Sequence, residues 1–503
     1  MRNCTAHDAL DRLWLARLWR RKPWTGPPVP PLDLREDSPA ISTFLRCAAR
    51  CGLPRLTTLP LELVEIIQPL SKPHFFWRYV AAIDLAARLS AGPSRPLQSV
   101  PLATVISWER GCAPVCGEER GDDSRPIIRL TVDCEGLRKI ERLPGRPSYD
   151  PRRFDDVAFV VEEQRYFAAA VAHFKNGLLH LAIALMDHSL QVWATPAPPD
   201  LVKCLVRPER PAACMRLHTI NLAEASGITF LMDPKSQPME IHTHSKSTPC
   251  AKATFDRLDR RQWPWVWIYV PLPRRDPLTH FGCFIADADD YGSSDVPRFL
   301  MRTRLAGDTM VGLHCWGADG TGRFIVSDAR PTTLIYATGL APPISDIWPY
   351  SNSESRAAQT LSLVNARGYP RSEEFSSRHW YFSSAPLGDV GEIQIFFEDD
   401  GIHCRGLLLE YASGARKALG QCRLLVDRSK TYTSPSYIGF ANVKGPPSAR
   451  EPEGRPLVMV SFEDVPEDDG AWSRYAMVGT LRFWFAPLWS RLEIQEGFEL
   501  RAS

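Results

Sequence analysis

One helical pattern dominates the N-terminal region of the chain: TTLPLELVEIIQPL, residues 57–70. Its apolar side chains recur at i, i+4, i+7, i+8 and i+11, the spacing of one face of a helix. These positions are Leu59, Leu63, Ile66, Ile67 and Leu70. Thr58 is a candidate N-cap, and Pro60 suits a first helical turn, where its missing N–H costs nothing. Pro69 predicts the end of the helix because proline cannot donate the bond that continues it.

A second apolar helix is predicted after the turn at residues 71–73, with Phe76, Val80 and Ile83 on one face. The two helices define a predicted helical unit at residues 56–92. Residues 1–55 precede it and read as an amphipathic helix at residues 8–21 followed by a proline-rich connector at residues 25–39.

The helical unit resembles an F-box. That family opens with a Leu-Pro dipeptide on an amphipathic helix, which corresponds here to LPLELVEI (residues 59–66), and a second apolar helix follows, here with WRYV at residues 77–80. The arrangement, with its β-rich remainder, also resembles F-box-like proteins of filamentous fungi. The family's usual third segment, a cysteine or arginine followed by an aromatic, is replaced at residues 82–88 by AIDLAAR.

This resemblance implies a docking surface for a Skp-type adaptor, which would tether the chain to a cullin–RING ubiquitin ligase. The implied adaptor-binding residues are Leu59, Pro60, Leu63, Ile66, Ile67 and Leu70. The alternative is a structural hairpin that packs on the neighbouring β-domain. Exposure distinguishes the two, since a docking helix leaves the side chains between Leu59 and Ile67 partly accessible and a structural hairpin buries them.

The remainder of the chain predicts β-structure. Residues 100–340 form one predicted β-rich domain, containing alternating runs such as IIRLTV at residues 127–132. Residues 341–387 have little periodicity and are interpreted as a connecting segment. Residues 388–503 form a second β-block, in which Asp400-Gly401 is a strong hairpin signal. We therefore expect an α+β fold, with the helical hairpin followed by sandwich-like β-blocks, and the pattern leaves open whether the two blocks share a core.

Composition excludes several function classes. The 503 residues include 60 Lys+Arg and 58 Asp+Glu, a net charge of +2 that gives no basic surface for nucleic acid. The longest apolar run near the middle, residues 178–186, is far shorter than the ~18–20 residues that span a bilayer. Thirteen cysteines, an odd number, favour free thiols in the cytoplasm or nucleus.

No sequence motif for catalysis is present, and no cofactor or metal is predicted. His242 and His244 would share one strand face, which we interpret as exposed and unliganded. The pairs Cys47/Cys51 and Cys112/Cys116 lack a second ligand pair, and Cys47 and Cys51 are interpreted as buried helical side chains. His314-Cys315 and His403-Cys404 are strand neighbours that point to opposite faces, so neither pair forms a nucleophile–base dyad.

Trp263, Trp265, Trp267 and Tyr269 alternate onto one strand face. Such a row either stacks on a sugar ring or forms the floor of a core. Because Val266, Ile268 and Val270 make the other face apolar as well, we predict that the strand is buried.

The sequence therefore favours a non-enzymatic interaction protein, an F-box-like substrate receptor for an unidentified client. The alternative is a carbohydrate- or ligand-binding β-sandwich protein whose helical hairpin is purely structural. An enzyme with a site assembled from distant residues is the least favoured hypothesis. Client identity and oligomeric state are left open.

Overall fold

The computed structural model is mostly β-strand (51%), with helix a minor part (14%). It describes residues 39–496, apart from the gaps 72–74, 78, 82, 85–96, 118–123, 134–135, 155, 176, 183–190, 202–203, 205–215, 259–264, 285–296, 314–320, 328, 339–343, 345–346, 352–357, 365–379, 446–453 and 464–471. The helix predicted at residues 8–21 and nearly all of the proline-rich connector lie outside the described residues. The chain divides into two compact units, Met1–Pro198 and Pro199–Ser503, a boundary inside the β-domain predicted at residues 100–340.

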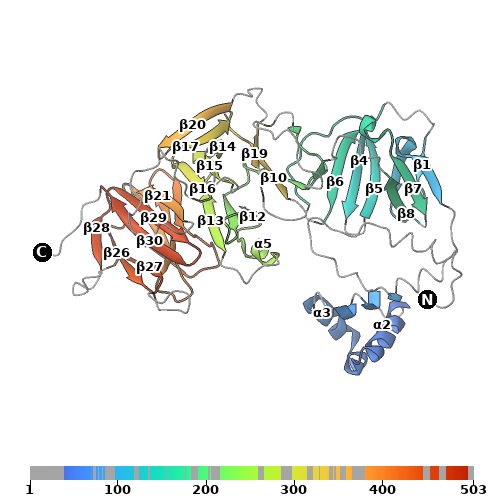
Figure 1. The fold of residues 1–503 in the computed structure, drawn as a ribbon, viewed down its shortest axis with the longest axis horizontal. Coiled ribbons are helices and arrows are strands. Elements are labelled where there is room, and N and C mark those ends of the chain that lie inside the picture. Colours follow the sequence, from blue (N-terminus) through green and yellow to red (C-terminus); the bar gives the residue numbers. More distant parts are fainter. Residues whose placement is uncertain are drawn as a thin grey trace. The chain divides into compact units, whose positions relative to one another are not determined.

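From residue 39 the first unit is helical (Figure 1): it contains α2 (Pro39–Arg50), the short 3-10 helix η2 (Pro54–Thr58), α3 (Leu61–Leu70) and further helical residues at 75–77, 79–81 and 83–84. Their shared core consists of Phe44, Cys47, Val64, Trp77 and Val80. Phe44 of α2 stacks on Trp77, with ring centroids 5.9 Å apart. The prediction of a two-helix hairpin therefore lacked one helix. That helix is α2, which lies within the predicted segment 1–55. Phe44 and Cys47 lie on one face of α2 and pack into the same core as α3.

The structure corrects the predicted N-cap of α3 and confirms its predicted C-terminal end. Thr58 does not cap the helix: Pro60 holds the N-cap position, and the Thr58 hydroxyl donates to the carbonyl of Arg55 at 3.0 Å. The helix ends at Leu70, one residue after Pro69, as predicted. There the Ser71 N–H and hydroxyl both donate to the Ile67 carbonyl, at 2.9 and 2.6 Å, and satisfy an acceptor that the helix leaves open.

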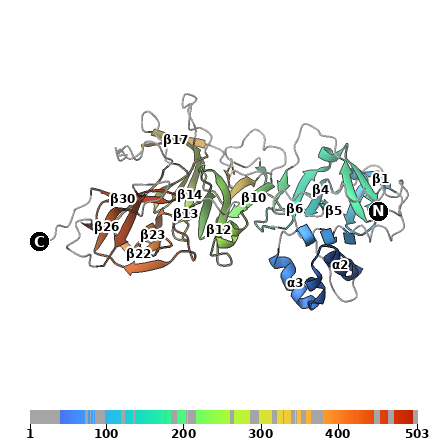
Figure 2. The ribbon, with the colours of Figure 1, turned by 60° about the horizontal axis from the view of Figure 1, so that its bottom comes forward.

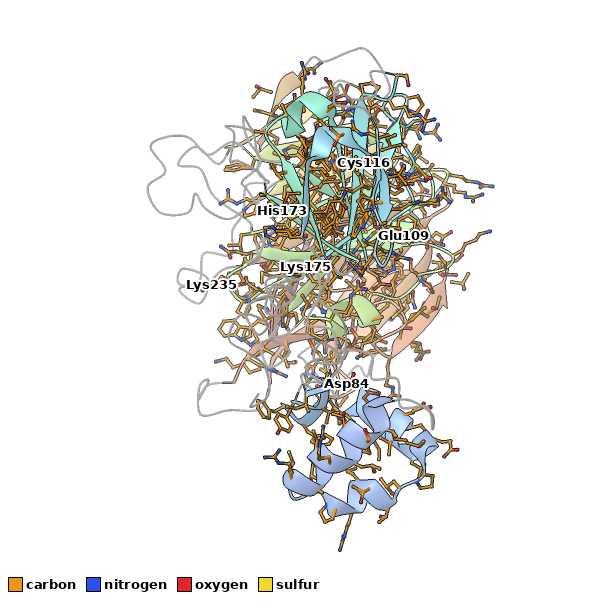
Figure 3. All side chains as sticks on the ribbon, turned by 90° about the vertical axis from the view of Figure 1, so that its right-hand side faces the viewer. Asp84, Glu109, Cys116, His173, Lys175 and Lys235 are labelled. Carbon is orange, nitrogen blue, oxygen red and sulfur yellow. The ribbon has the colours of Figure 1, made fainter. Side chains whose placement is uncertain are left out.

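The β-part of the first unit contains an antiparallel sheet in the order β1-β7-β8 and a second series of strands in the order β9-β6-β4-β5-β2-β3. The bounds are β1 Gln98–Pro101, β2 Val105–Glu109, β3 Val115–Cys116, β4 Ile127–Asp133, β5 Gly136–Leu143, β6 Ala158–Glu163, β7 Val171–Lys175, β8 Leu178–Ala182 and β9 Val192–Trp193. The strand predicted at residues 127–132 is β4. His173 of β7, labelled in Figure 3, hydrogen-bonds to Ser99 of β1 at 2.7 Å and joins these two strands through their side chains.

The described residues of the second unit contain six groups of paired strands. Figures 1 and 2 show these strands in colours from green to red. Three groups come first along the chain, in the orders β19-β18-β10, β12-β11-β13 and β16-β15-β14-β17-β20. Their bounds are β10 Arg216–Asn221, β11 Gly227–Met232, β12 Pro238–His244, β13 Val266–Pro271, β14 Leu278–Phe284, β15 Phe299–Thr303, β16 Gly307–Val311, β17 Thr321–Ser327, β18 Thr333–Thr338, β19 Ile347–Tyr350 and β20 Ala358–Val364. One short helix, α5 (Lys252–Asp256), lies between β12 and β13.

The three remaining groups have the orders β21-β29-β30, β24-β23-β22-β25 and β27-β26-β28. Their bounds are β21 Tyr381–Pro386, β22 Val390–Phe397, β23 Cys404–Tyr411, β24 Arg416–Gly420, β25 Ser429–Thr433, β26 Tyr437–Lys444, β27 Pro456–Ser461, β28 Ser473–Ala476, β29 Thr480–Ala486 and β30 Trp489–Gln495. The hairpin predicted at Asp400-Gly401 joins β22 to β23, but not by the expected two-residue type I′ turn: residues 398–403 connect the strands, and Gly401 has a positive φ of 72° while Asp400 does not.

One hydrophobic core joins the two predicted β-blocks. It combines Phe230 and Phe281 from the earlier strands with Ile393, Leu407 and Phe483 from the later ones, all nearly inaccessible to solvent. The segment at residues 341–387, expected to be a connector, contains β19, β20 and the start of the C-terminal strands at β21. The two blocks therefore share a core, which the sequence left open.

Candidate functional site: an exposed apolar face on α3

The outer face of α3 carries large apolar side chains in solvent. Leu63 is 46% exposed, Ile66 55% and Leu70 79%, at positions i, i+3 and i+7 of one helix face. The opposite face is packed, since Val64 is 1% exposed and contributes to the core of the helical unit. We call Leu63, Ile66 and Leu70 the α3 face.

The other predicted docking residues lie around this face. Pro60 is exposed at the N-cap of α3, whereas Leu59 and Ile67 are half-buried and pack against the helical core. The single stripe expected from the sequence is therefore divided. Leu59 precedes the helix, and Ile67, three residues after Val64, turns toward the core instead of solvent.

Two further exposed features lie on α3 or shortly after it in the sequence. Glu62 and Glu65 are exposed on the same helix and give its surface an acidic character. Phe75, just beyond the turn that follows α3, is 80% exposed and stacks on Tyr79 with ring centroids 6.4 Å apart. Sequence reasoning missed Phe75, although its i, i+4 spacing from Tyr79 is the signal of an aromatic pair on one helix face.

The interpretation of His242 and His244 as exposed residues is wrong. They are 7% and 2% exposed on β12, with ring centroids 4.7 Å apart. His242 faces the Thr254 hydroxyl at 2.8 Å and the Thr248 carbonyl at 3.0 Å. His244 faces the Thr229 hydroxyl at 2.7 Å and the Pro249 carbonyl at 2.9 Å. The segment after β12 folds back over them, which alternation along the strand could not indicate.

Burial controls the charge of His244. The pKa of His244 is lowered to about 4, chiefly by desolvation, with the charge of His242 acting in the same direction and the bond to the Pro249 carbonyl in the opposite one. His244 is therefore neutral at pH 7.

Burial of the tryptophan strand is confirmed. Trp265 is 7% exposed and Trp267 2%, and both pack with Leu231 and Met239 under α5. Val266, Ile268 and Val270 on the other face belong to the large shared core. Trp263 lies outside the described residues. The described part of this strand thus presents no exposed aromatic platform.

The described cysteines differ in their exposure to solvent. The described ones are free thiols, with Cys47 buried as predicted and Cys51 exposed, contrary to prediction, because α2 ends one residue before it. Cys404 is fully buried, and burial raises the pKa of its thiol, while adjacent His403 pairs with Asp400 at 2.5 Å. His403 and Cys404 therefore form no nucleophile–base dyad, and His314-Cys315 lies outside the described residues.

Within the described ranges, no group of three or more His, Cys, Asp or Glu side chains could hold a metal ion. Among the same residues no helix combines the length and apolarity needed to cross a membrane. The α3 face is thus the feature of the described structure that most resembles a binding site. No protein-family model matches this chain, and neither does a curated protein or a solved structure.

Proposed function

We propose that the chain is a non-enzymatic interaction protein that docks through the α3 face on a Skp-type adaptor. The β-rich remainder would present a client protein to the associated cullin–RING ubiquitin ligase. The proposal rests on the F-box resemblance of residues 59–66 and on one structural observation, the exposure of Leu63, Ile66 and Leu70.

Exposure at these positions favours docking over a purely structural hairpin. A helix that only supports a fold turns its large apolar side chains inward, because each buried Leu or Ile contributes roughly 1.5–3 kcal/mol. Here Val64 supplies the buried side, while three larger side chains remain in solvent along one line. A row of apolar anchors at helical spacing is the arrangement by which a helix occupies a hydrophobic groove.

The surroundings of the α3 face add two expectations about the adaptor. Exposed Glu62 and Glu65 border the apolar row, so the rim of the groove should carry positive charge near them. Pro60 and Phe75 are further exposed apolar residues, the first at the N-cap of α3 and the second five residues after its end. Additional contact area of this kind is needed, because three side chains alone fall short of the ~800 Å² per partner of a standard interface.

On this proposal the β-rich part is the client receptor, with its sheets packed in a sandwich-like manner within an α+β fold. Free thiols at the described cysteines support a reducing compartment, the cytoplasm or nucleus. The alternative is a carbohydrate- or ligand-binding β-sandwich protein, and its candidate aromatic platform included Trp265 and Trp267, which are both buried. No observation in the described structure favours it.

Affinity purification of the tagged full-length chain from its native cells tests the proposal. A Skp-type adaptor and a cullin should co-elute in amounts comparable to the bait, measured by quantitative mass spectrometry. The matched control is a chain with Leu63→Ala, Ile66→Ala and Leu70→Ala, which should retain its fold and lose both proteins. Absence of adaptor from the wild-type eluate, or equal recovery with the variant, would contradict the proposal.

A further inference from the structure

The segment that follows β12 covers one face of the β12-β11-β13 sheet. Residues 245–251 turn back from the end of β12, and α5 then places Phe255 over the tryptophans, with ring centroids 5.8 Å from Trp265 and 5.1 Å from Trp267. Ala251 and Leu258 complete the contact with this face. We call residues 245–257 the cover segment.

Two buried histidines provide the polar link between the sheet and the cover segment. A carbonyl oxygen only accepts hydrogen bonds, so the ring nitrogens that face Thr248 and Pro249 must carry the protons. His242 is therefore protonated at Nε2 and His244 at Nδ1. The other nitrogen of each ring accepts from a threonine hydroxyl, Thr254 for His242 and Thr229 for His244.

We propose that His242 and His244 form a pH-sensitive latch, which holds the cover segment on the sheet while both rings are neutral and releases it from Trp265 and Trp267 when acid protonates them. The inference is independent of the proposed adaptor binding, because the latch lies on β12 and not on the helical unit.

Geometry explains why protonation would break the latch. Each ring already uses both nitrogens, and an added proton requires the threonine hydroxyl to rotate from donor to acceptor, which a hydroxyl can do, so the cost of protonation lies in the charge. The added charge is buried, and the ring centroids are only 4.7 Å apart, so a second charge is repelled by the first. Opening the cover segment returns both rings to water.

Charged groups near the pair belong to four elements. Arg257 donates a hydrogen bond to the Thr254 hydroxyl at 3.4 Å, and this hydroxyl in turn donates to His242. The positive charge of Arg257 opposes protonation of the His242 ring. Glu240 shares the strand face of both histidines and favours protonation. The turn after β12 contributes Lys246 and Cys250. On α5, Lys252 and Asp256 form an ion pair with each other. On β13, the ring centroid of Tyr269 lies 5.0 Å from that of His244.

The pKa of His244 gives the direction and the size of the change in the opening equilibrium with pH. Its pKa is about 4 when covered and 6.5 in its ordinary state, so the open form binds more protons between these values. The latch is therefore fully stable above pH 6.5 and weakens as the pH falls toward 4. From His244 alone, the equilibrium constant for opening should rise about 30-fold between pH 7.5 and pH 5.

Hydrogen exchange of the full-length chain, measured by mass spectrometry at pH 7.5 and pH 5 and corrected for intrinsic exchange rates, tests the latch. Peptides within residues 245–257 should show the roughly 30-fold rise in opening, while peptides of β26 and β27 should not change. The decisive variant is His242→Gln with His244→Asn. The glutamine amide nitrogen takes the place of Nε2 and the asparagine amide nitrogen that of Nδ1, so both bonds to the carbonyls can persist without a titrating group.

This double variant should keep the cover segment closed at both pH values, and a control variant, His403→Gln, should behave like the wild type. The latch is refuted if the wild-type segment exchanges equally at both pH values, if β26 and β27 open to the same extent, or if the double variant retains the rise. Should the double variant not fold, His244→Asn alone must reduce the rise, and an unchanged rise would refute the proposal.

Discussion

Replacing Leu63, Ile66 and Leu70 together by alanine should abolish adaptor binding while the chain still folds. Burying a Leu or Ile side chain completely is worth roughly 1.5–3 kcal/mol. Because Leu63 and Ile66 are only about half exposed, at 46% and 55%, docking can recover about 1 kcal/mol from each. Leu70, at 79%, can contribute about 2 kcal/mol. The combined loss is about 4 kcal/mol, which weakens the Kd by nearly a thousandfold.

Isothermal titration of the purified chain with a purified Skp-type adaptor measures this difference. The second unit offers a matched control, because its Leu305, Ile402 and Leu425 are 44%, 58% and 76% exposed. Alanine at these three positions removes the same side-chain types with nearly the same exposure, and it should leave the Kd unchanged. Circular dichroism should show that both triple variants fold, with thermal midpoints lowered from that of the wild type by a similar few degrees, because each variant loses the buried parts of its half-exposed side chains.

Two results would refute this reasoning. If the α3 variant bound the adaptor as tightly as the wild type, the exposed row would not be the anchor. If its thermal midpoint fell by many more degrees than that of the control variant, the three side chains would belong to a core and not to a docking surface.

Three further predictions concern the second unit and the thiols. Trp267→Ala should lower the free energy of unfolding by about 3–5 kcal/mol, measured by urea denaturation, because the side chain is 2% exposed and packs under Phe255. Asp427→Asn should cost about 3–5 kcal/mol in the same assay, because this buried carboxylate pairs with Arg405 at 3.2 Å and also with Arg423. In native protein, iodoacetamide should label the exposed thiols quickly and leave the buried ones until denaturant is added, as peptide mass spectrometry would show. The exposed thiols are Cys51, Cys112 and Cys116, and the buried ones are Cys47, Cys204, Cys404 and Cys422.

Helical periodicity predicted α3 and its end at Pro69, but it could not assign the exposed face. Leu63, Val64, Ile66 and Ile67 are all apolar, so the helix offers two candidate inner sides. The choice depends on α2, whose Phe44 and Cys47 pack with Val64 from a segment well before the motif. Tertiary packing of this kind overrides local pattern.

The same limit applies to the β-part. Burial of Trp267 was predictable because both faces of its strand are apolar over a short local stretch. The histidines of β12 share a face as expected, but what covers that face is the chain after the strand ends. The strands at residues 347–386 were missed because β20 pairs with β17 and β21 pairs with β29, so their partners are remote and their Ser-rich sequences show little alternation.

Site-specific photo-crosslinking tests the docking role of α3 most directly. A photoreactive amino acid replaces Ile66 in one sample and Ile402 in the other, two isoleucines of nearly equal exposure, at 55% and 58%. Each protein is irradiated with equimolar purified Skp-type adaptor and analysed by gel electrophoresis and mass spectrometry. The account predicts a crosslinked product at position 66 and none at position 402. Equal crosslinking at both positions, or none at position 66, would contradict it.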